Sequence, residues 1–207
     1  NINTCSSEFL DQLEWQWKEI AIPFWQKIDK IAGENGVKVG LEMHPQNLVY
    51  TPLNMIRLVE QGNLKNIGAE MDPSHLFWQQ IDPIYSLEVL GELVYTAAAK
   101  DVRINPGVRL AGVIDDRFTR VPKNENPLLL SHDGQFTLNK SPKDSAWDFV
   151  ALGEGHDQEF WNKFLQTLAR TSPKTDIAIE HEDASYGREE GVAVAAKVLK
   201  TAYASIK

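Results

Sequence analysis

Acidic residues and histidines recur in this chain where short apolar stretches end. Each stretch is rich in Val, Ile, Leu, Ala or Met and is followed at once by carboxylates, imidazoles or a lysine. Five such segments follow one another: VKVGLEMHP at 37–45, IGAEMDPSH at 67–75, VYTAAAKDVR at 94–103, DFVALGEGHD at 148–157 and DIAIEHED at 176–183. Carboxylate oxygens and imidazole nitrogens bind divalent metals and transfer protons, so these residue types predict a metal-assisted or acid–base site.

Helical patterns separate the apolar segments. Residues 7–33 carry apolar side chains at spacings of three and four, and Pro23 predicts a kink there or two successive helices. Thr51-Pro52 and Asp82-Pro83 each place a capping residue before a proline, which is typical of a helix start. Further helices are predicted at 158–170 and 188–206. Strands that alternate with such helices predict parallel βαβ units, whose strand ends meet at one rim.

One long connection interrupts this alternation. About residues 105–146 stand where a short turn is expected, and they are rich in Pro, Gly and Asp. Residues 135–138 predict one strand of a small hairpin, and a short, weak parallel strand is expected after the segment at Val150–Leu152. Because the segment leaves from the same rim as the polar residues, it predicts a lid or interface loop, with a surface excursion of little role as the alternative.

The composition limits the function classes. The 207 residues are 43% hydrophobic and carry a net charge of −8, without the basic cluster of a nucleic-acid-binding protein. Cys5 is the only cysteine, which excludes an intramolecular disulfide. No apolar run approaches the roughly 20 residues of a membrane span, and the first residues lack a signal-peptide pattern. These features predict a cytoplasmic protein that binds neither nucleic acid nor membrane.

The ordered set of motifs resembles the xylose isomerase-like superfamily of sugar phosphate isomerases and epimerases, which also includes endonuclease IV and inosose dehydratase. The matching pieces are LEMHP, MDPSH, AKD, LGEG and IEHED, and they extend over nearly the whole chain. The resemblance implies an α/β fold, a (β/α)8 TIM barrel, of which residues 1–207 would form one partial domain. About five βα units, strands four to eight, are expected, with an inserted loop region at about 105–146. A complete, smaller open α/β sheet is the alternative.

The resemblance also implies a divalent metal ion as cofactor, with Mn²⁺ favoured over Mg²⁺, Co²⁺ or Zn²⁺. The implied ligands are Glu42, Asp72 and Glu180, at the ends of the fourth, fifth and eighth strands. The family's histidine ligand on the sixth strand is missing, because Ala98 and Thr96 occupy the two positions where it is expected. Alternation along that strand predicts that residues 96, 98 and 100 share one face. We therefore expect weaker metal binding than in relatives with four ligands.

The implied reaction is proton transfer next to a carbonyl of a sugar, sugar phosphate or cyclitol, catalysed by Glu42 and Glu180 as in an isomerase or epimerase. The predicted substrate-binding residues are His44, His75, Lys100, Arg103 and His156. A dehydratase using the same site is one alternative, and a non-catalytic barrel that binds a sugar or a partner is another. A phosphodiesterase is the weakest reading, since five histidines are too few. The partner expected is a small molecule, and exposed sheet edges predict a homo-oligomer.

Several of these residues also have structural interpretations. His156 is a candidate for the missing ligand or for a polar residue at the start of the next helix, and Lys100 for an ion pair with Asp101. Either His181 or Glu182 is expected to share the rim with Glu180. Glu70 and Glu154 are candidates for carboxylates behind the site or for salt-bridged residues. Trp78, Trp147 and Trp161 are expected in the core, with stacking on a sugar ring as the alternative.

Overall fold

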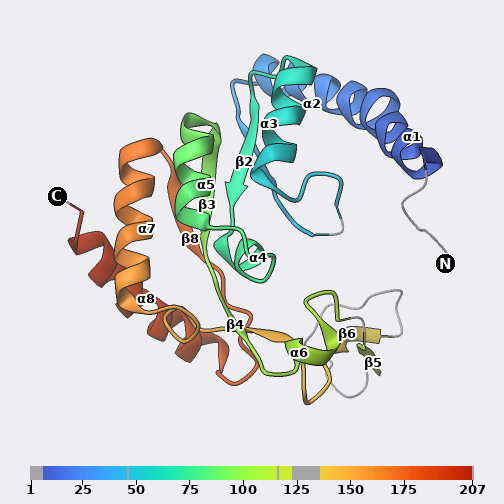
Figure 1. The fold of residues 1–207 in the computed structure, drawn as a ribbon. Helices are drawn as coiled ribbons and strands as arrows, with labels where there is room; N and C mark the ends of the chain where they lie inside the picture. The colour runs from blue at the N-terminus through green and yellow to red at the C-terminus, as the bar shows by residue number, and fades with distance from the viewer. Residues whose placement is uncertain (1–6, 46, 116, 123–135, 207) are drawn as a thin grey trace.

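A four-stranded parallel sheet forms the centre of the structure, a computed structural model that describes residues 7–45, 47–115, 117–122 and 136–206. Its strands are β1 (Val39–Glu42), β2 (Ile67–Met71), β3 (Val94–Ala99) and β8 (Asp176–Ile179), in the order β1-β2-β3-β8 (Figure 1). All three pairings are parallel, so the four carboxyl ends lie at one edge. The α/β class predicted from the sequence is confirmed.

Helices cover the outer face of this sheet. The N-terminal helical run consists of α1 (Ser7–Trp15), the π-helical segment η1 (Gln16–Ala21) and α2 (Ile22–Glu34). The later elements are α3 (Pro52–Gly62), α4 (Pro73–Phe77), α5 (Pro83–Leu90), the 3₁₀ turn η2 (Gly91–Leu93), α7 (Gln158–Thr171) and α8 (Arg188–Ala204). Helices α2, α3, α5 and α7 pack one against the next. None of the described helices is both long and apolar enough to cross a membrane.

The predicted helix starts are confirmed by their capping hydrogen bonds. Thr51 Oγ1 accepts from Asn54 N at 3.1 Å, and Asp82 Oδ1 accepts from Ile84 N at 2.8 Å. Near Pro23 the helical run continues through η1, so a π-helical turn stands immediately before the proline instead of two separate helices. A π-turn is one of the usual ways in which a helix accommodates such an interruption.

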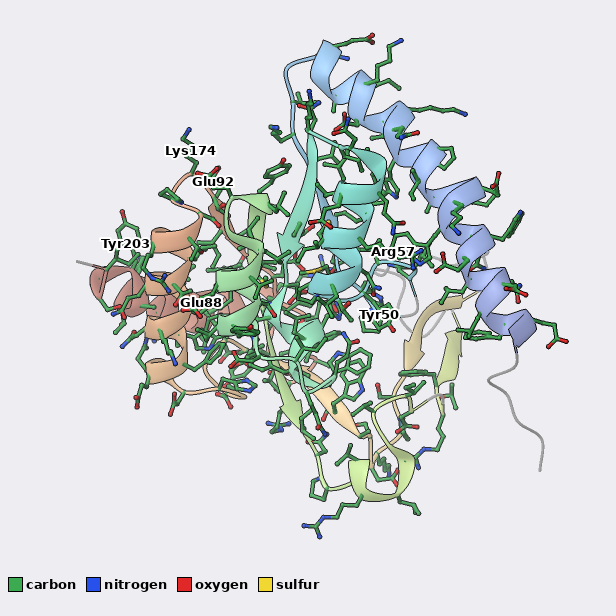
Figure 2. The ribbon with its side chains drawn as sticks, turned by 45° about the horizontal axis from the view of Figure 1, so that its top comes forward. Tyr50, Arg57, Glu88, Glu92, Lys174 and Tyr203 are labelled. Atoms are coloured by element: carbon green, nitrogen blue, oxygen red, sulfur yellow. The ribbon has the colours of Figure 1, made fainter. Side chains whose placement is uncertain are left out.

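Ion pairs hold neighbouring helices together. Arg57 of α3 contacts Glu14 of α1 at 2.8 Å and covers the ring of the buried Trp17 of η1 at 4.5 Å (Figure 2). On the other side of the molecule, Arg170 of α7 contacts Glu88 of α5 at 2.8 Å. Because these pairs lie at or near the surface, they contribute little to stability, and apolar packing dominates.

Two antiparallel hairpins form the inserted region. Strand β3 continues past Lys100 as β4 (Asp101–Ile104), which pairs with β7 (Trp147–Val150). Between them lie the short helix α6 (Val108–Ala111) and a second hairpin of β5 (Thr119–Pro122) and β6 (Phe136–Lys140). The hairpin strand predicted at 135–138 therefore lies at β6, except that Gln135 falls outside the described residues.

The weak parallel strand expected at Val150–Leu152 is not formed. Val150 instead ends β7 and lies opposite Asp101 in an antiparallel pair. Because β4 extends beyond the rim, the returning chain pairs with that extension, and β3 pairs directly with β8. The described parallel sheet thus has four strands where about five βα units were expected.

The hydrophobic core lies between the sheet and its helices. Strand β2 contributes Ile67, Ala69 and Met71, all inaccessible to solvent. Helices α3, α5 and α7 supply the buried Met55, Leu58, Leu87, Trp161 and Phe164. The core interpretation of Trp161 is confirmed.

Replacing Leu58 by Ala is expected to lower the free energy of unfolding by about 2–5 kcal/mol, because it leaves a cavity in this core. Leu53→Ala is the matched control, since both leucines lie on α3 but Leu53 is 74% exposed and Leu58 is 0% exposed. Urea unfolding followed by circular dichroism measures both changes. Equal effects of the two substitutions would contradict the placement of α3.

Candidate active site at the strand ends

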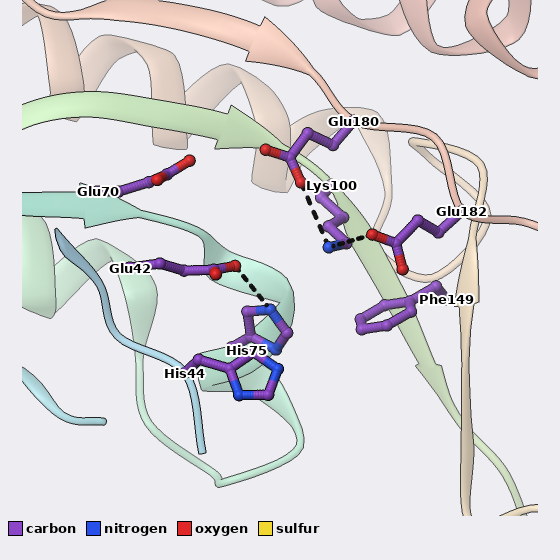
Figure 3. A pocket seen from close by; sticks show the side chains of 8 residues that line it. All are labelled: Glu42, His44, Glu70, His75, Lys100, Phe149, Glu180 and Glu182. Atoms are coloured by element: carbon purple, nitrogen blue, oxygen red, sulfur yellow. Dashed lines mark hydrogen bonds and ion pairs between the residues drawn. The ribbon is translucent and has the colours of Figure 1, made fainter. Parts of the chain in front are cut away.

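A cavity of about 320 Å³ opens at the carboxyl ends of the parallel strands (Figure 3). Four strands position its polar residues: Glu42 ends β1, Glu70 lies on β2, Lys100 follows β3 and Glu180 follows β8. Asp72, which follows β2, is buried beside the cavity, 3.5 Å from Lys100. The side chains that line the cavity are Glu42, His44, Glu70, His75, Lys100, Phe149, Glu180 and Glu182. The structure therefore brings together most of the residues predicted from the strand-end pattern.

Glu42, Asp72 and His75 form the one group of the described residues in which three potential metal-ligand atoms converge. One ligand atom from each lies within 4.8 Å of the others. His75 Nε2 is 3.0 Å from Glu42 Oε1 and 3.3 Å from Asp72 Oδ2. Asp72 and His75 are both buried.

The unused hydrogen-bonding capacity of this group fits a divalent cation. Asp72 Oδ1 accepts from Ser74 N at 2.8 Å and so begins α4, but Asp72 Oδ2 has no hydrogen-bond donor within the described structure. His75 Nδ1 likewise has no hydrogen-bond partner there. Asp72 Oδ2 is compensated in part by the ion-pair contact with Lys100 Nζ at 3.5 Å, so it retains the capacity to bind a further cation. Carboxylates together with imidazole suit Mn²⁺ or Zn²⁺.

The predicted ligand set differs from this group in one member. Glu180 is not part of the three-residue group; its Oε2 lies 3.3 Å from Lys100 Nζ. His75, predicted as a substrate contact, is part of it. The Asp-x-x-His spacing explains this, because α4 begins at Pro73 and one helical turn brings His75 back beside Asp72. Glu180 remains a proposed ligand.

Lys100 is the positive charge among the carboxylates of the cavity. Its side chain is buried, 4% exposed for the whole residue, and its Nζ lies 2.9 Å from Glu182 Oε1 and 3.5 Å from Asp72 Oδ2. It also lies 4.5 Å from the centre of the Phe149 ring. Burial favours the neutral amine, but the charges of Asp72, Glu182 and Glu180 outweigh it and raise the pKa of Lys100. The lysine therefore stays protonated, and the predicted alternative of an ion pair with Asp101 is not seen.

The two glutamates nearest β1 and β2 differ in their electrostatics. The hydrogen bond from His75 lowers the pKa of Glu42, which keeps its carboxylate ionised. Burial, followed by the charges of Glu42 and Glu180, raises the pKa of Glu70. Glu70 lies opposite Glu42 in the sheet register and lines the cavity, so it belongs to the site rather than to the surface.

Glu70, Phe149 and Glu182 line the cavity although none of them was predicted as a catalytic, substrate-binding or metal-ligating residue. The expectation that either His181 or Glu182 shares the rim with Glu180 is confirmed for Glu182. His181 points to α8, where its ring occupies the space that a Cβ on Gly191 would need. Alternation along an extended segment could have identified Glu182 directly, because it follows Glu180 by two residues.

The side chains along β3 alternate between the two faces of the sheet as predicted, which places Thr96, Ala98 and Lys100 on one face. A Cβ on Gly40 would lie 2.9 Å from Thr96 Cγ2, so Thr96 faces the inside of the sheet, as Lys100 does. Ala97 and Ala99 belong to the hydrophobic core on the other face. Ala98 therefore points inward, and a methyl group stands where the resemblance implies an imidazole.

The structure places His156 and Arg103 outside the cavity. His156 Nδ1 lies 2.7 Å from Asp101 Oδ1, and its ring stacks on Phe77 with 3.5 Å between ring centres. Arg103 is exposed and lies 3.9 Å from Asp148. Asp157, not His156, caps the following helix, by accepting from Phe160 N at 2.9 Å. A buried carboxylate such as that of Asp101 needs hydrogen-bond donors, and the imidazole of His156 supplies one.

Replacing His156 by Phe is expected to leave Mn²⁺ affinity within about twofold of the wild type. The same change should lower the free energy of unfolding by about 1.5–3 kcal/mol, because the stack on Phe77 persists while the hydrogen bond to Asp101 is lost. Calorimetric titration and urea unfolding measure the two quantities. A tenfold loss of metal affinity would instead make His156 part of the metal site.

Comparisons with known proteins agree with this architecture. The family model of the xylose isomerase-like TIM barrel matches residues 4–202. The uncharacterized protein YfiH of Bacillus subtilis (strain 168) is 31% identical over 192 residues, which are 92% of this chain and 55% of that protein. The chain thus spans about half the length of this curated relative.

Solved structures show the same fold at lower identity. A xylose isomerase domain protein from Planctomyces limnophilus has a TM-score of 0.56 at 19% identity, over 89% of this chain and 51% of its own. AsbF of Bacillus anthracis, described as a probable 3-DHS dehydratase, has a TM-score of 0.55 at 17% identity, over 86% and 53%. A Mycobacterium smegmatis protein of this fold, solved in complex with magnesium, has a TM-score of 0.51 at 13% identity, over 91% and 51%.

Proposed function

Because the chain belongs to the xylose isomerase-like TIM barrel family, we propose that it is a metal-dependent isomerase or epimerase. The proposed reaction moves a proton at a carbon next to the carbonyl of a sugar, sugar phosphate or cyclitol. One observation carries the proposal: Glu42, Asp72 and His75 converge in a cavity that Lys100 and Glu180 also enter. We further propose that the protein is cytoplasmic. We also propose that it forms a homo-oligomer, because β1 and β8 are the edge strands of the described sheet and each leaves one side unpaired.

Glu42, Asp72 and His75 are the residues that would hold the ion, and Glu180 is a candidate for a further ligand. Four glutamates and Asp72 surround one lysine in this cavity, so the local charge is negative and attracts a cation. A divalent ion bound here would polarise a carbonyl and make the neighbouring C–H bond more acidic. Mn²⁺ is favoured, and Mg²⁺, Co²⁺ and Zn²⁺ are the alternatives.

Two carboxylates are placed to move the proton. Glu42 and Glu180 extend toward the cavity from the ends of β1 and β8, and Glu180 lies above Glu42 in Figure 3. Glu42, ionised because His75 donates to it, would take the proton from carbon. Returning the proton to the neighbouring carbon isomerises the substrate. Delivery of a proton to the opposite face of the same carbon by Glu180, in its carboxylic acid form, epimerises it, and the proton taken by Glu42 is then exchanged with solvent. Lys100 would hold the negative charge that develops on the substrate oxygen.

A dehydratase is the second candidate, because the same proton abstraction can be followed by loss of a hydroxyl group from the next carbon. The structural likeness to AsbF, described as a probable dehydratase, favours keeping this candidate. A non-catalytic sugar-binding protein is the third candidate, and it is favoured by Ala98 at the position of the missing histidine.

Removing Glu42 or Asp72 as a ligand should weaken Mn²⁺ binding by roughly tenfold or more. Calorimetry of Glu42→Gln and Asp72→Asn tests this, with Glu182→Gln as the control, because Glu182 contacts Lys100 but lies outside the three-residue group. Tight binding that survives the double substitution of Glu42 and Glu180 by Gln would rule out the assignment. In the same titration Ala98→His should increase the affinity, whereas Ala98→Leu adds volume without a donor and should not.

Solvent exchange tests the proton transfer directly. With Mn²⁺ in D₂O, the protein should incorporate deuterium next to the carbonyl of at least one member of a panel of ketohexoses, their phosphates and inososes. Mass spectrometry and NMR detect the label, and EDTA or Glu42→Gln should abolish it. If metal binds normally but no compound exchanges or loses water, the non-catalytic candidate is the better one.

A further inference from the structure

A second and larger cavity, of about 790 Å³, adjoins the carboxylate cavity. The two share His44, His75 and Phe149 as lining residues. On the side away from the strand ends, the second cavity is walled by the inserted region through Val113, Ile114, Asp115, Phe118 and Trp147. We call this second cavity the aromatic groove, and a ligand in the carboxylate cavity has direct access to it.

Aromatic rings line the groove in an unbroken series that begins at the proposed metal ligands. His75 contacts His44 with 4.3 Å between ring centres and Phe149 with 5.6 Å. Phe149 contacts Trp147 at 5.1 Å, and Trp147 stacks on Trp78 at 5.0 Å with an interplanar angle of 11°. The rings offer flat, polarisable surfaces on which another ring can stack.

Several polar atoms along this wall are satisfied by the protein itself, whereas Trp78 Nε1 and His75 Nδ1 have no hydrogen-bond partner among the described residues. Trp147 Nε1 donates to Val113 O at 3.0 Å, and Gln79 Nε2 donates to His75 O at 2.6 Å. Both carboxylate oxygens of Asp115 accept from Arg117, at 2.7 and 2.8 Å. Most of the exposed lining of the groove is nevertheless apolar, so it replaces little of the water around the hydroxyls of a second sugar and favours an apolar ring.

The inserted region is also tied to the rest of the structure, so the groove exists before a ligand binds. The hydrogen bond from Trp147 to Val113 joins β7 to the outer wall. Arg117 links Asp115 to Asp144 at 3.1 Å on the other side of the same segment. A preformed apolar surface of this kind binds without the entropic cost of ordering a loop.

We propose that the substrate has two parts, a polyhydroxylated carbonyl unit in the carboxylate cavity and an aromatic ring attached to it that lies in the aromatic groove. The substrate class is therefore an aryl-substituted sugar or cyclitol rather than a free monosaccharide. The position of the first part rests on the proposed function. The position of the ring rests on the groove alone, and Trp78 and Trp147 thereby have a binding role in addition to packing.

The test compares methyl and 4-fluorophenyl glycosides of glucose, galactose and mannose, with cellobiose as a two-sugar probe. Dissociation constants are measured by calorimetry and by ¹⁹F NMR competition in the presence of Mn²⁺. For at least one hexose the aryl glycoside should bind about tenfold or more tightly than the methyl glycoside, since ring stacking and apolar burial both contribute. Equal affinities for all three pairs, or no binding of any aryl glycoside, would overturn the proposal.

Substitutions locate the preference in the groove. Phe118→Ala and Trp147→Ala should reduce the aryl-to-methyl ratio to less than about threefold, whereas Trp147→Phe should retain most of it. Phe118 is 44% exposed, so its removal leaves the core intact even if Trp147→Ala unfolds the hairpin. Trp15→Ala is the control, because Trp15 is exposed on α1 and lines neither cavity. A ratio that survives both Phe118→Ala and Trp147→Ala overturns the proposal.

The outcomes separate this proposal from the proposed function. Deuterium exchange without an aryl preference would leave the proton-transfer chemistry standing and remove the aromatic substrate. An aryl preference without exchange on any compound, once aryl-substituted ketoses are added to the panel, would retain the aromatic groove as a binding site and remove the proton-transfer chemistry. If cellobiose binds more tightly than the aryl glycosides and Phe118→Ala weakens it, the groove binds a second sugar and the aromatic assignment is wrong.

Discussion

The buried ammonium group of Lys100 is the charge on which the arrangement of the site depends. Asp72, Glu180 and Glu182 come from two different strand ends, and their carboxylates would repel one another without a cation between them. Removing one partner from a buried ion pair costs about 3–5 kcal/mol, because the remaining charge is left without compensation. Lys100 therefore holds the ends of β2, β3 and β8 in one geometry.

The next residue, Asp101, organises the opposite side of the same strand. Successive side chains of a strand point to opposite faces, so Lys100 enters the cavity while Asp101 turns away from it. Asp101 Oδ2 accepts from the backbone nitrogens of Gly153, Gly155 and His156, at 3.0, 3.1 and 3.0 Å. A Cβ on Gly155 would collide with the carbonyl oxygen of Val102, so only glycine allows this approach. The LGEG motif therefore forms a turn that is hydrogen-bonded to Asp101, and this turn fixes the position of the preceding strand β7.

Lys100 and the proposed metal ion would share the carboxylate of Asp72, which explains how a site without the sixth-strand histidine remains organised. Asp72 Oδ2 lies 3.3 Å from His75 Nε2 and 3.5 Å from Lys100 Nζ, so it stands between the proposed ion site and the lysine. Ala98 leaves the inward position below Lys100 without a donor. The proposed ion would therefore rely on Glu42, Asp72 and His75, and Lys100 would supply the positive charge on the side of β8.

The sequence alone determined the ends of β1, β2, β3 and β8, the residues that cap α3 and α5, and the shared face of Thr96, Ala98 and Lys100. These features follow from periods of 2 and 3.6 residues and from capping chemistry, which act between near neighbours in the chain. Only the tertiary structure decided that Val150 pairs antiparallel with Asp101, that His156 serves Asp101 instead of the cavity, and that His75 joins Glu42 and Asp72 while Glu180 turns to Lys100. Each of these outcomes depends on which residue pairs with a buried charge or which strand pairs with a strand edge. Most of these partners are far apart in the sequence, as Lys100 and Glu180 are, at a separation of 80 residues. Local spacing brings His75 beside Asp72, but it contains no information about the distant partners, because desolvation and pairing across the folded chain select them.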